Sequence, residues 1–428
     1  MTLDQSTRPR TLLADLRATY APLLEEIAAG TVQRELDGEL PTEQVRRLKE
    51  AGFGAVRVPV EHGGRGADLV ELTQLWINLA TADANLPQAL RGHFALAEDR
   101  LFQHVLGDDQ RAWFARFAAG EIAGNAWSEV GSTGIDTQQT VLTRDGDGYR
   151  INGEKYYTTG SIFAEWADVY TRRPGGATGR GEDDYVIAVV DTRERGVTVT
   201  DDWDGFGQRG TGSGTTAFDD VWVNAENVLV FSRRFPYQTA FYQLNLLATL
   251  TGIGRAALRD AVAAVRRRER NYSHANAPRV RDDAQVLARI GEIAAAVYAA
   301  EATTLRVAAA LEATFRAGRG PDATLRALNE AAEIESSAAQ VVVTDLVLRA
   351  TSDLFDTLGA SATSRAHALD RHWRNARTVS SHNPRILKAR VVGGYEVNGT
   401  PPPYAWAIGA TERGQAWSSS ADEAASSA

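Results

Sequence analysis

The sequence predicts an α+β protein with an N-terminal α-helical domain, a central antiparallel β domain and a C-terminal four-helix bundle. Apolar residues recur every three or four positions at both ends of the chain, as in amphipathic helices, but alternate in the middle, as in strands. The length of 428 residues leaves room for several domains. We expect domains at residues 11–120, 121–235 and 236–410, with tails at 1–10 and 411–428.

The first domain is predicted to be helical. Its first helix carries an apolar face of Leu12, Leu16, Tyr20 and Leu23. A second helix begins at Pro41 and ends near Gly52, because proline is favoured at the first turn of a helix and glycine just past its end. The glycine-rich VPVEHGGRG is expected to break the chain between helices.

The second domain is predicted to be a sheet. TVLTRDGDGYRINGEKYYT consists of two alternating runs around Asp-Gly-Asp-Gly, the pattern of a β-hairpin. Further strands are expected at YVIAVVD, GVTVTDDW and TTAFDDVWV. No helical pattern separates them, which favours an antiparallel arrangement.

The third domain is predicted to be an antiparallel bundle of four long helices of ~20–35 residues, the last around ALDRHWRNARTV. Alanine-rich faces would allow close packing between helices or subunits. Residues 383–404 form a segment rich in proline and glycine.

Composition excludes several classes of protein. The chain has no cysteine, so it has no disulfide and no thiolate metal site. Its seven histidines lack metal-site spacing, and we predict no metal. The net charge of -9 argues against nucleic acid as a partner. With neither a secretion signal nor a long apolar run, we expect no membrane span and a cytoplasmic location.

One glycine motif is a false match. GFGQRG, at residues 205–210, fits the dinucleotide fingerprint by letters, but that fingerprint should open a helix after a strand. Here it leads into TGSGTT and another strand, so we interpret it as a loop between strands. No convincing nicotinamide site is present.

Two polar segments are candidate ligand-binding loops. GNAWSEVGS, at residues 124–132, combines an amide, an indole and hydroxyls, which could meet a flat polar ligand. KYYTTGS, at residues 155–161, places hydroxyls directly after a strand. On chemistry alone, an interdomain connection and a hydroxyl-rich strand end are the simpler interpretations.

Taken together, these segments resemble the acyl-CoA dehydrogenase superfamily. AWSEVGS is similar to its flavin-side T-E-P-x-x-G-S loop, and INGEKYYTTGS to its N-G-x-K-x-[WY]-I-[TS] strand. FGQRGTGSGTTAFDDVWVNAENVLV and RHWRNAR resemble two later motifs, in the family's order. The resemblance spans roughly residues 15–400 and implies the predicted architecture.

The chain departs from the dehydrogenases where many of them carry the catalytic base. A Y-E-G-T loop supplies a glutamate there, whereas this chain has His382 and Asn383. An asparagine amide cannot abstract a proton. Glu396 is a candidate for the base by residue type alone. The alternative function is therefore an acyl-CoA dehydrogenase with a relocated base and bound FAD. A catalytically inactive binding scaffold is a third hypothesis.

A histidine at this place is typical of the superfamily's reduced-flavin-dependent monooxygenases, which include dibenzothiophene monooxygenase and related sulfur-acquisition enzymes. This branch implies reduced FMN or FAD, O₂ and a flavin C4a-hydroperoxide that oxygenates a small aromatic, sulfur- or nitrogen-containing substrate. It further implies a separate NAD(P)H:flavin reductase and a homotetramer whose flavin sites are completed by a neighbouring subunit.

The resemblance also assigns residues. It implies catalytic roles for His93, Ser161 and His382, because a histidine with a pKa near neutrality can pass a proton to and from the flavin peroxide. Around the flavin it places Asn125, Trp127, Ser128, Thr159, Ser161 and Trp203. The flavin phosphate needs cationic partners, for which Arg270, Arg281 and Arg371 are the weaker candidates.

Overall fold

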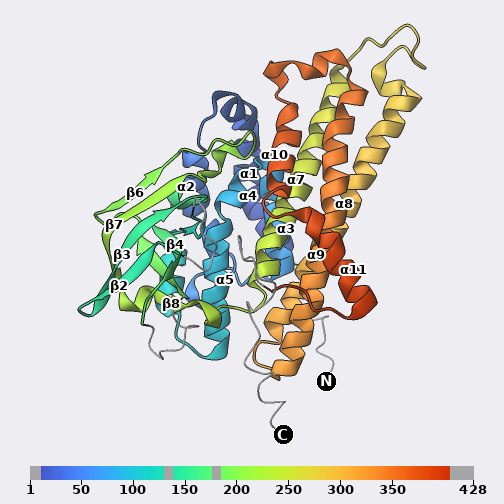
Figure 1. The fold of residues 1–428 in the computed structure, drawn as a ribbon. Coiled ribbons are helices and arrows are strands. Elements are labelled where there is room, and N and C mark those ends of the chain that lie inside the picture. Colours follow the sequence, from blue (N-terminus) through green and yellow to red (C-terminus); the bar gives the residue numbers. More distant parts are fainter. Residues whose placement is uncertain (1–10, 130–137, 176–184, 405–428) are drawn as a thin grey trace.

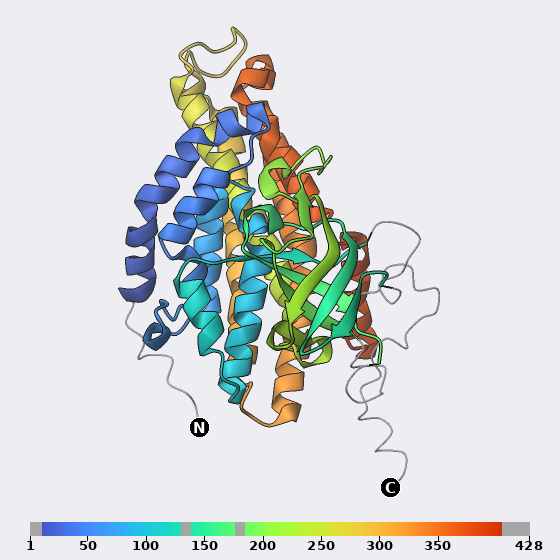
Figure 2. The ribbon, with the colours of Figure 1, turned by 90° about the vertical axis from the view of Figure 1, so that its left-hand side faces the viewer.

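The computed structural model describes residues 11–129, 138–175 and 185–404. Figure 1 shows the sheet on one side of the molecule and the long bundle helices on the other. Figure 2 shows the N-terminal helices beside the sheet, with the bundle behind both. The predicted tails, and Val130 to Ser132 of the GNAWSEVGS segment, lie outside the described residues.

The N-terminal region is helical, as predicted. Its helices are α1 (Thr11–Asp37), α2 (Thr42–Glu50), α3 (Leu69–Ala82), α4 (Leu86–Ala89), α5 (Arg91–Leu106) and α6 (Arg111–Ala118). Leu16 and Tyr20 of the expected apolar face are buried. Pro41 stands directly before α2, and Gly52 adopts a left-handed conformation just after it.

The central sheet contains the predicted hairpin, β2 (Val141–Asp145) and β3 (Gly148–Lys155), and the predicted strands β5 (Tyr185–Asp191), β6 (Val197–Thr200) and β7 (Thr215–Asn224). Three further strands were not predicted: β1 (Ala123–Ala126), β4 (Trp166–Arg172) and β8 (Val228–Val230). The order is β6-β7-β3-β2-β4-β5-β8, with β1 on β4. The sheet is mostly antiparallel, but β1 and β2 both pair with β4 in parallel. The intervening chain is long enough to bring β4 back in the direction of β1.

The C-terminal region forms the bundle, from α7 (Gln238–Arg267), α8 (Ala284–Arg316), α9 (Asp322–Asp353) and α10 (Asp370–Ser380). The fourth helix is shorter than expected, because 3₁₀ turns occupy the chain between α9 and α10. The glycine- and proline-rich segment contains a further helix, α11 (Lys388–Asn398), which packs on α9. This packing outweighs the poor helix propensity of its two central glycines.

One described helix, α8, is long and apolar enough to cross a membrane by length and composition. It packs against α3, α7 and α9 and is therefore a member of the bundle.

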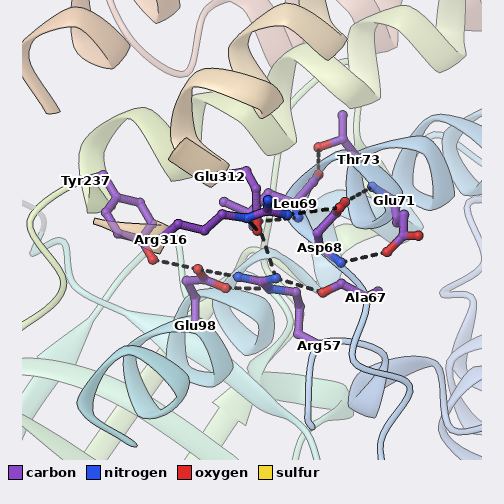
Figure 3. A network of polar contacts seen from close by, with 10 residues as sticks. All are labelled: Arg57, Ala67, Asp68, Leu69, Glu71, Thr73, Glu98, Tyr237, Glu312 and Arg316. Atoms are coloured by element: carbon purple, nitrogen blue, oxygen red, sulfur yellow. Dashed lines mark hydrogen bonds and ion pairs between the residues drawn. The ribbon is translucent and has the colours of Figure 1, made fainter. Parts of the chain in front are cut away.

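A buried polar network joins the N-terminal helices to the bundle (Figure 3). The Arg57 guanidinium makes two hydrogen bonds of 2.8 Å to the Glu98 carboxylate. The Tyr237 hydroxyl donates to the same carboxylate at 2.6 Å, and Arg57 also donates to the carbonyl of Ala67 at 2.7 Å. Glu312 of α8 accepts from the backbone N–H of Leu69 at 2.9 Å. Since each charge has partners, this cluster is typical of a structural core.

Candidate active site

Four segments meet where the helices contact the sheet: the α4–α5 turn, β1, the loop after β3, and the first turns of α7. Two glycines allow the backbones to approach. A Cβ on Gly124 would come within 2.3 Å of the backbone nitrogen of Ser161, and one on Gly160 within 2.0 Å of the Ala89 carbonyl oxygen. Any side chain at these two positions would push β1, α4 and the loop apart.

Hydrogen bonds hold β1 and the loop after β3 together. The Asn125 backbone N–H donates to the Thr159 carbonyl at 3.1 Å, and the Ser161 hydroxyl donates to the Asn125 carbonyl at 3.4 Å. The Thr159 hydroxyl meets that of Ser213 at 2.8 Å. The Asn125 side-chain oxygen is buried without a partner among the described residues. Such an orphaned acceptor is expected where a ligand supplies the missing donor.

An aromatic pair flanks this loop. Tyr157 has a φ of 58°, which is unusual for a non-glycine residue and turns the chain sharply after β3. Its carbonyl accepts from the Asn125 side-chain amide at 3.4 Å, while its exposed ring lies 5.8 Å from Trp203, centroid to centroid. Ser128 bridges to Tyr156 through a 2.8 Å backbone hydrogen bond. The structure thus groups six predicted flavin-side residues: Asn125, Trp127, Ser128, Thr159, Ser161 and Trp203.

Trp127 extends from β1 toward the start of α7. Its indole N–H donates to Asp168 at 2.8 Å, and Arg234 pairs with the same carboxylate at 2.9 Å. The indole ring lies 5.4 Å from the Tyr242 ring, centroid to centroid. The Arg91 guanidinium in turn stacks on Tyr242, 5.1 Å from its ring centroid. A row of side chains therefore runs from the sheet to the N-terminus of α5.

His382 follows α10 and approaches this row. Loss of hydration and, to a smaller extent, the Arg91 charge lower the pKa of His382 from its ordinary 6.5. His382 remains exposed to solvent, so this loss of hydration is partial. Near neutral pH the imidazole is uncharged in the ligand-free protein. The resemblance implies a histidine with a pKa near neutrality; the Arg91 charge that lowers this pKa is brought near His382 only by the fold.

His93 lies apart from His382. Its Nε2 is 2.8 Å from the Gly54 carbonyl oxygen, and its ring packs edge-on against Phe94 and Phe117. Residues two apart on an α-helix point about 200° apart, so Arg91 and His93 project from nearly opposite sides of α5. His93 therefore lies in the helical core, where burial lowers its pKa to about 4.

The three candidate phosphate ligands are not grouped with the other residues. Arg270 and Arg281 are exposed in the segment between α7 and α8, which lies at the end of the bundle away from the sheet (Figure 1). Arg371 is buried and paired with Asp260, and it also donates to the Ala368 carbonyl at 3.0 Å.

Two residues of the row were missed by the sequence analysis. Arg91 stands two positions before His93, and Tyr242 lies in the FPYQTAFYQ segment. No pattern in one sequence distinguishes a buried arginine from the many surface arginines, so only the fold could identify it. GFGQRG, by contrast, is a loop between β6 and β7 as predicted; Gly210 donates to Asn85 at 3.1 Å.

The chain matches the family in all three parts. The acyl-CoA dehydrogenase N-terminal domain matches residues 14–121, the middle domain residues 124–221 and the C-terminal domain residues 245–384. Together these matches extend over most of the described fold.

Similar proteins and solved structures also match this chain over most of its length. A dibenzothiophene monooxygenase of Mycolicibacterium goodii is 28% identical, over 93% of this chain and 97% of its own. A probable FMNH2-dependent monooxygenase of Pseudomonas putida, SfnC, is 26% identical over 94% and 98%. FMN-bound TdsC of Paenibacillus sp. A11-2 superimposes with a TM-score of 0.82 at 26% identity, covering 92% and 99%. The chain therefore belongs to the acyl-CoA dehydrogenase superfamily, within the branch of the reduced-flavin-dependent monooxygenases.

Proposed function

We propose that the protein is the oxygenase of a two-component system that uses reduced FMN and O₂ to oxygenate a small sulfur-containing or aromatic substrate. The reaction balances as substrate plus reduced flavin plus O₂, giving oxygenated substrate, oxidised flavin and water. The observation that carries this proposal is the end of α10. It presents an imidazole and an amide, His382 and Asn383, where the dehydrogenase reaction would need a carboxylate.

The residues present fit a flavin. The ring system of a flavin is flat and edged with hydrogen-bonding atoms, and this site offers amide, hydroxyl and backbone groups next to aromatic walls. The unpartnered oxygen of Asn125 would accept from a ring N–H. Thr159 and Ser161 would contact the ring edge, with Trp127 and Trp203 beside it. When bound, the reduced flavin supplies the activation of O₂ and the transfer of one oxygen atom.

The protein's own part is to position groups and manage protons. We infer that His382 holds or moves a proton at the reacting oxygen, because it is exposed and near enough to Arg91 for that charge to lower the pKa of its ring. Ser161 would fix the flavin edge through its hydroxyl. We also propose a catalytic role for His93: its Nε2 is 2.8 Å from the Gly54 carbonyl oxygen, while its Nδ1 is buried without a partner among the described residues.

We also propose a homotetramer that works with a separate NAD(P)H:flavin reductase in the cytoplasm. Large apolar side chains remain exposed on the bundle, including Tyr298 of α8 at 77% and Val397 of α11 at 80%. Burial of such residues between subunits is favourable. Arg270 and Arg281 could then reach a flavin phosphate only in a neighbouring subunit. Light scattering at micromolar concentration should give four chains, and a flavin-binding monomer would contradict the proposal.

Anaerobic titration tests the cofactor directly. Reduced FMN should bind, and O₂-dependent product should form only when a reductase and NADH regenerate it. Purification as a yellow protein that an acyl-CoA bleaches would instead support the dehydrogenase. A protein that binds neither flavin nor acyl-CoA would favour the inactive scaffold.

A further inference from the structure

Arg91 differs from the other deeply buried arginines. Arg57 pairs with Glu98, Arg234 with Asp168 and Arg371 with Asp260. Arg91 is only 6% exposed, yet it has no hydrogen bond or ion pair within residues 11–129, 138–175 and 185–404. Its Nε is buried and unpartnered, as is the Nε of Arg234, but Arg234 has the Asp168 carboxylate as a partner. Burying a cation without a counter-charge is costly, so an unpaired arginine that persists suggests a missing anion.

A second unpartnered group lies beside it. The Tyr242 hydroxyl is buried without a partner among the described residues, and its ring lies under the Arg91 guanidinium. Loss of hydration raises the pKa of this hydroxyl, so at neutral pH it stays protonated and can donate. Arg91 also acts electrostatically on His382. Arg91 of α5 and Tyr242 of α7 are therefore in contact, and His382, after α10, is near enough for the Arg91 charge to act on it.

The chemistry of these donors selects the ligand. A guanidinium presents paired N–H groups that match two oxygens of a carboxylate or a sulfinate. We propose that Arg91 and Tyr242 bind a carboxylate or sulfinate group of the substrate next to His382, so that the preferred substrates are small organic anions. This inference rests on the proposed function. It distinguishes the chain from an oxygenase for neutral aromatic compounds, which would leave Arg91 without a partner.

The position of the site agrees with a substrate beside the flavin. The Tyr242 ring lies between Arg91, 5.1 Å away, and the flavin-side residue Trp127, 5.4 Å away. A negative charge here could come from the substrate or from the reduced flavin itself, which is also anionic. The experiment therefore needs one arm for each source.

Matched probes separate charge from shape. We would titrate the protein calorimetrically with benzenesulfinate and benzoate, and with the neutral compounds methyl phenyl sulfone and benzamide. The expected result is that the wild type binds the anions at least ~10-fold more tightly, the difference that ~1.4 kcal/mol produces. Arg91→Met and Arg91→Gln should abolish this preference, and Tyr242→Phe should weaken it. Arg306→Met, which removes an exposed charge on α8, should leave it intact.

Two sets of outcomes would contradict the inference. If the wild type shows no preference for anions, or Arg91→Gln keeps it, the inference is wrong. If the Arg91 variants lose reduced FMN but bind the probes normally, the anion is the flavin and the inference about substrate is also wrong. Reductase-dependent turnover of neutral substrates by Arg91→Gln would show that the proposed function stands, whichever way the anion test falls.

Discussion

The Arg57 network and the Arg91 site both bury an arginine against helices, but they are satisfied to different degrees. Arg57 meets Glu98, which also accepts from Tyr237, so donors and acceptors are matched (Figure 3). Within the described part of the chain, Arg91 has no ion pair and stacks on the face of Tyr242, whose hydroxyl is also unpartnered. A closed polar cluster, in which donors and acceptors are paired, stabilises the fold. An open cluster, in which buried polar groups are unpaired, indicates a place for a ligand.

Breaking the closed network should have the largest effect on stability. Glu98→Ala leaves the Arg57 charge and the Tyr237 hydroxyl buried without their acceptor. We expect the free energy of unfolding to fall by about 3–5 kcal/mol. Urea denaturation followed by circular dichroism measures this. A loss below ~1 kcal/mol would mean that the cluster is not structural.

At the open site the largest effect should be on turnover. His382→Ala should lower product formation by ~100-fold, or ~2.7 kcal/mol of barrier, because a positioned acid–base group is lost. Reduced flavin would still be consumed, with hydrogen peroxide released. The measurement is product per flavin oxidised, with melting temperature as the folding control. Wild-type coupling in the variant would assign His382 a structural role.

Removing the unpaired Arg91 charge should stabilise the ligand-free protein. Arg91→Met replaces a buried cation with an apolar side chain of similar length, which should raise the free energy of unfolding of the ligand-free protein by ~1 kcal/mol. Arg306→Met is the control for general loss of charge. A fall comparable to that of Glu98→Ala would show that Arg91 has a partner in the folded protein.

The smallest effect concerns pH. Burial lowers the pKa of His93 to about 4, below the ordinary 6.5 that it has when unfolded. Between these values the unfolded state binds more protons, so stability is lost as pH falls through 6.5 toward about 4. His93→Gln should reduce this slope by up to ~1.4 kcal/mol per pH unit. Unfolding titrations at pH 4.5 to 7 test it, and an unchanged slope would contradict it.

Local patterns were sufficient for the order of the three regions, but not for strands β1, β4 and β8. The alternation around Asp-Gly-Asp-Gly gave the β2–β3 hairpin, and the spacing of Leu16 and Tyr20 gave the buried face of α1. Helix α11 was missed because its packing on α9 overrides local propensity, and the parallel pairing of β1 with β4 depends on the whole sheet. The domain boundaries stay a prediction.

Only the part of the candidate site that lies in family-like motifs could be predicted from the sequence. The group around Asn125 and Ser161 followed from segments that resemble the family. Arg91 did not, because its significance lies in the absence of a partner, which is a property of the folded protein. The role of His93 came from the resemblance alone and stays a prediction; Arg91, two positions before it, projects from nearly the opposite side of α5.

The central claim is that the chain transfers one atom of O₂ to its substrate. The most direct test supplies reduced FMN, a reductase and ¹⁸O₂, with the sulfinate probe as substrate, and measures the mass of the product. The account predicts that the product gains one ¹⁸O atom for each molecule of substrate converted, and that His382→Ala lowers this yield. A product whose added oxygen comes from water, or dehydrogenation of an acyl-CoA without any added oxygen, would contradict it.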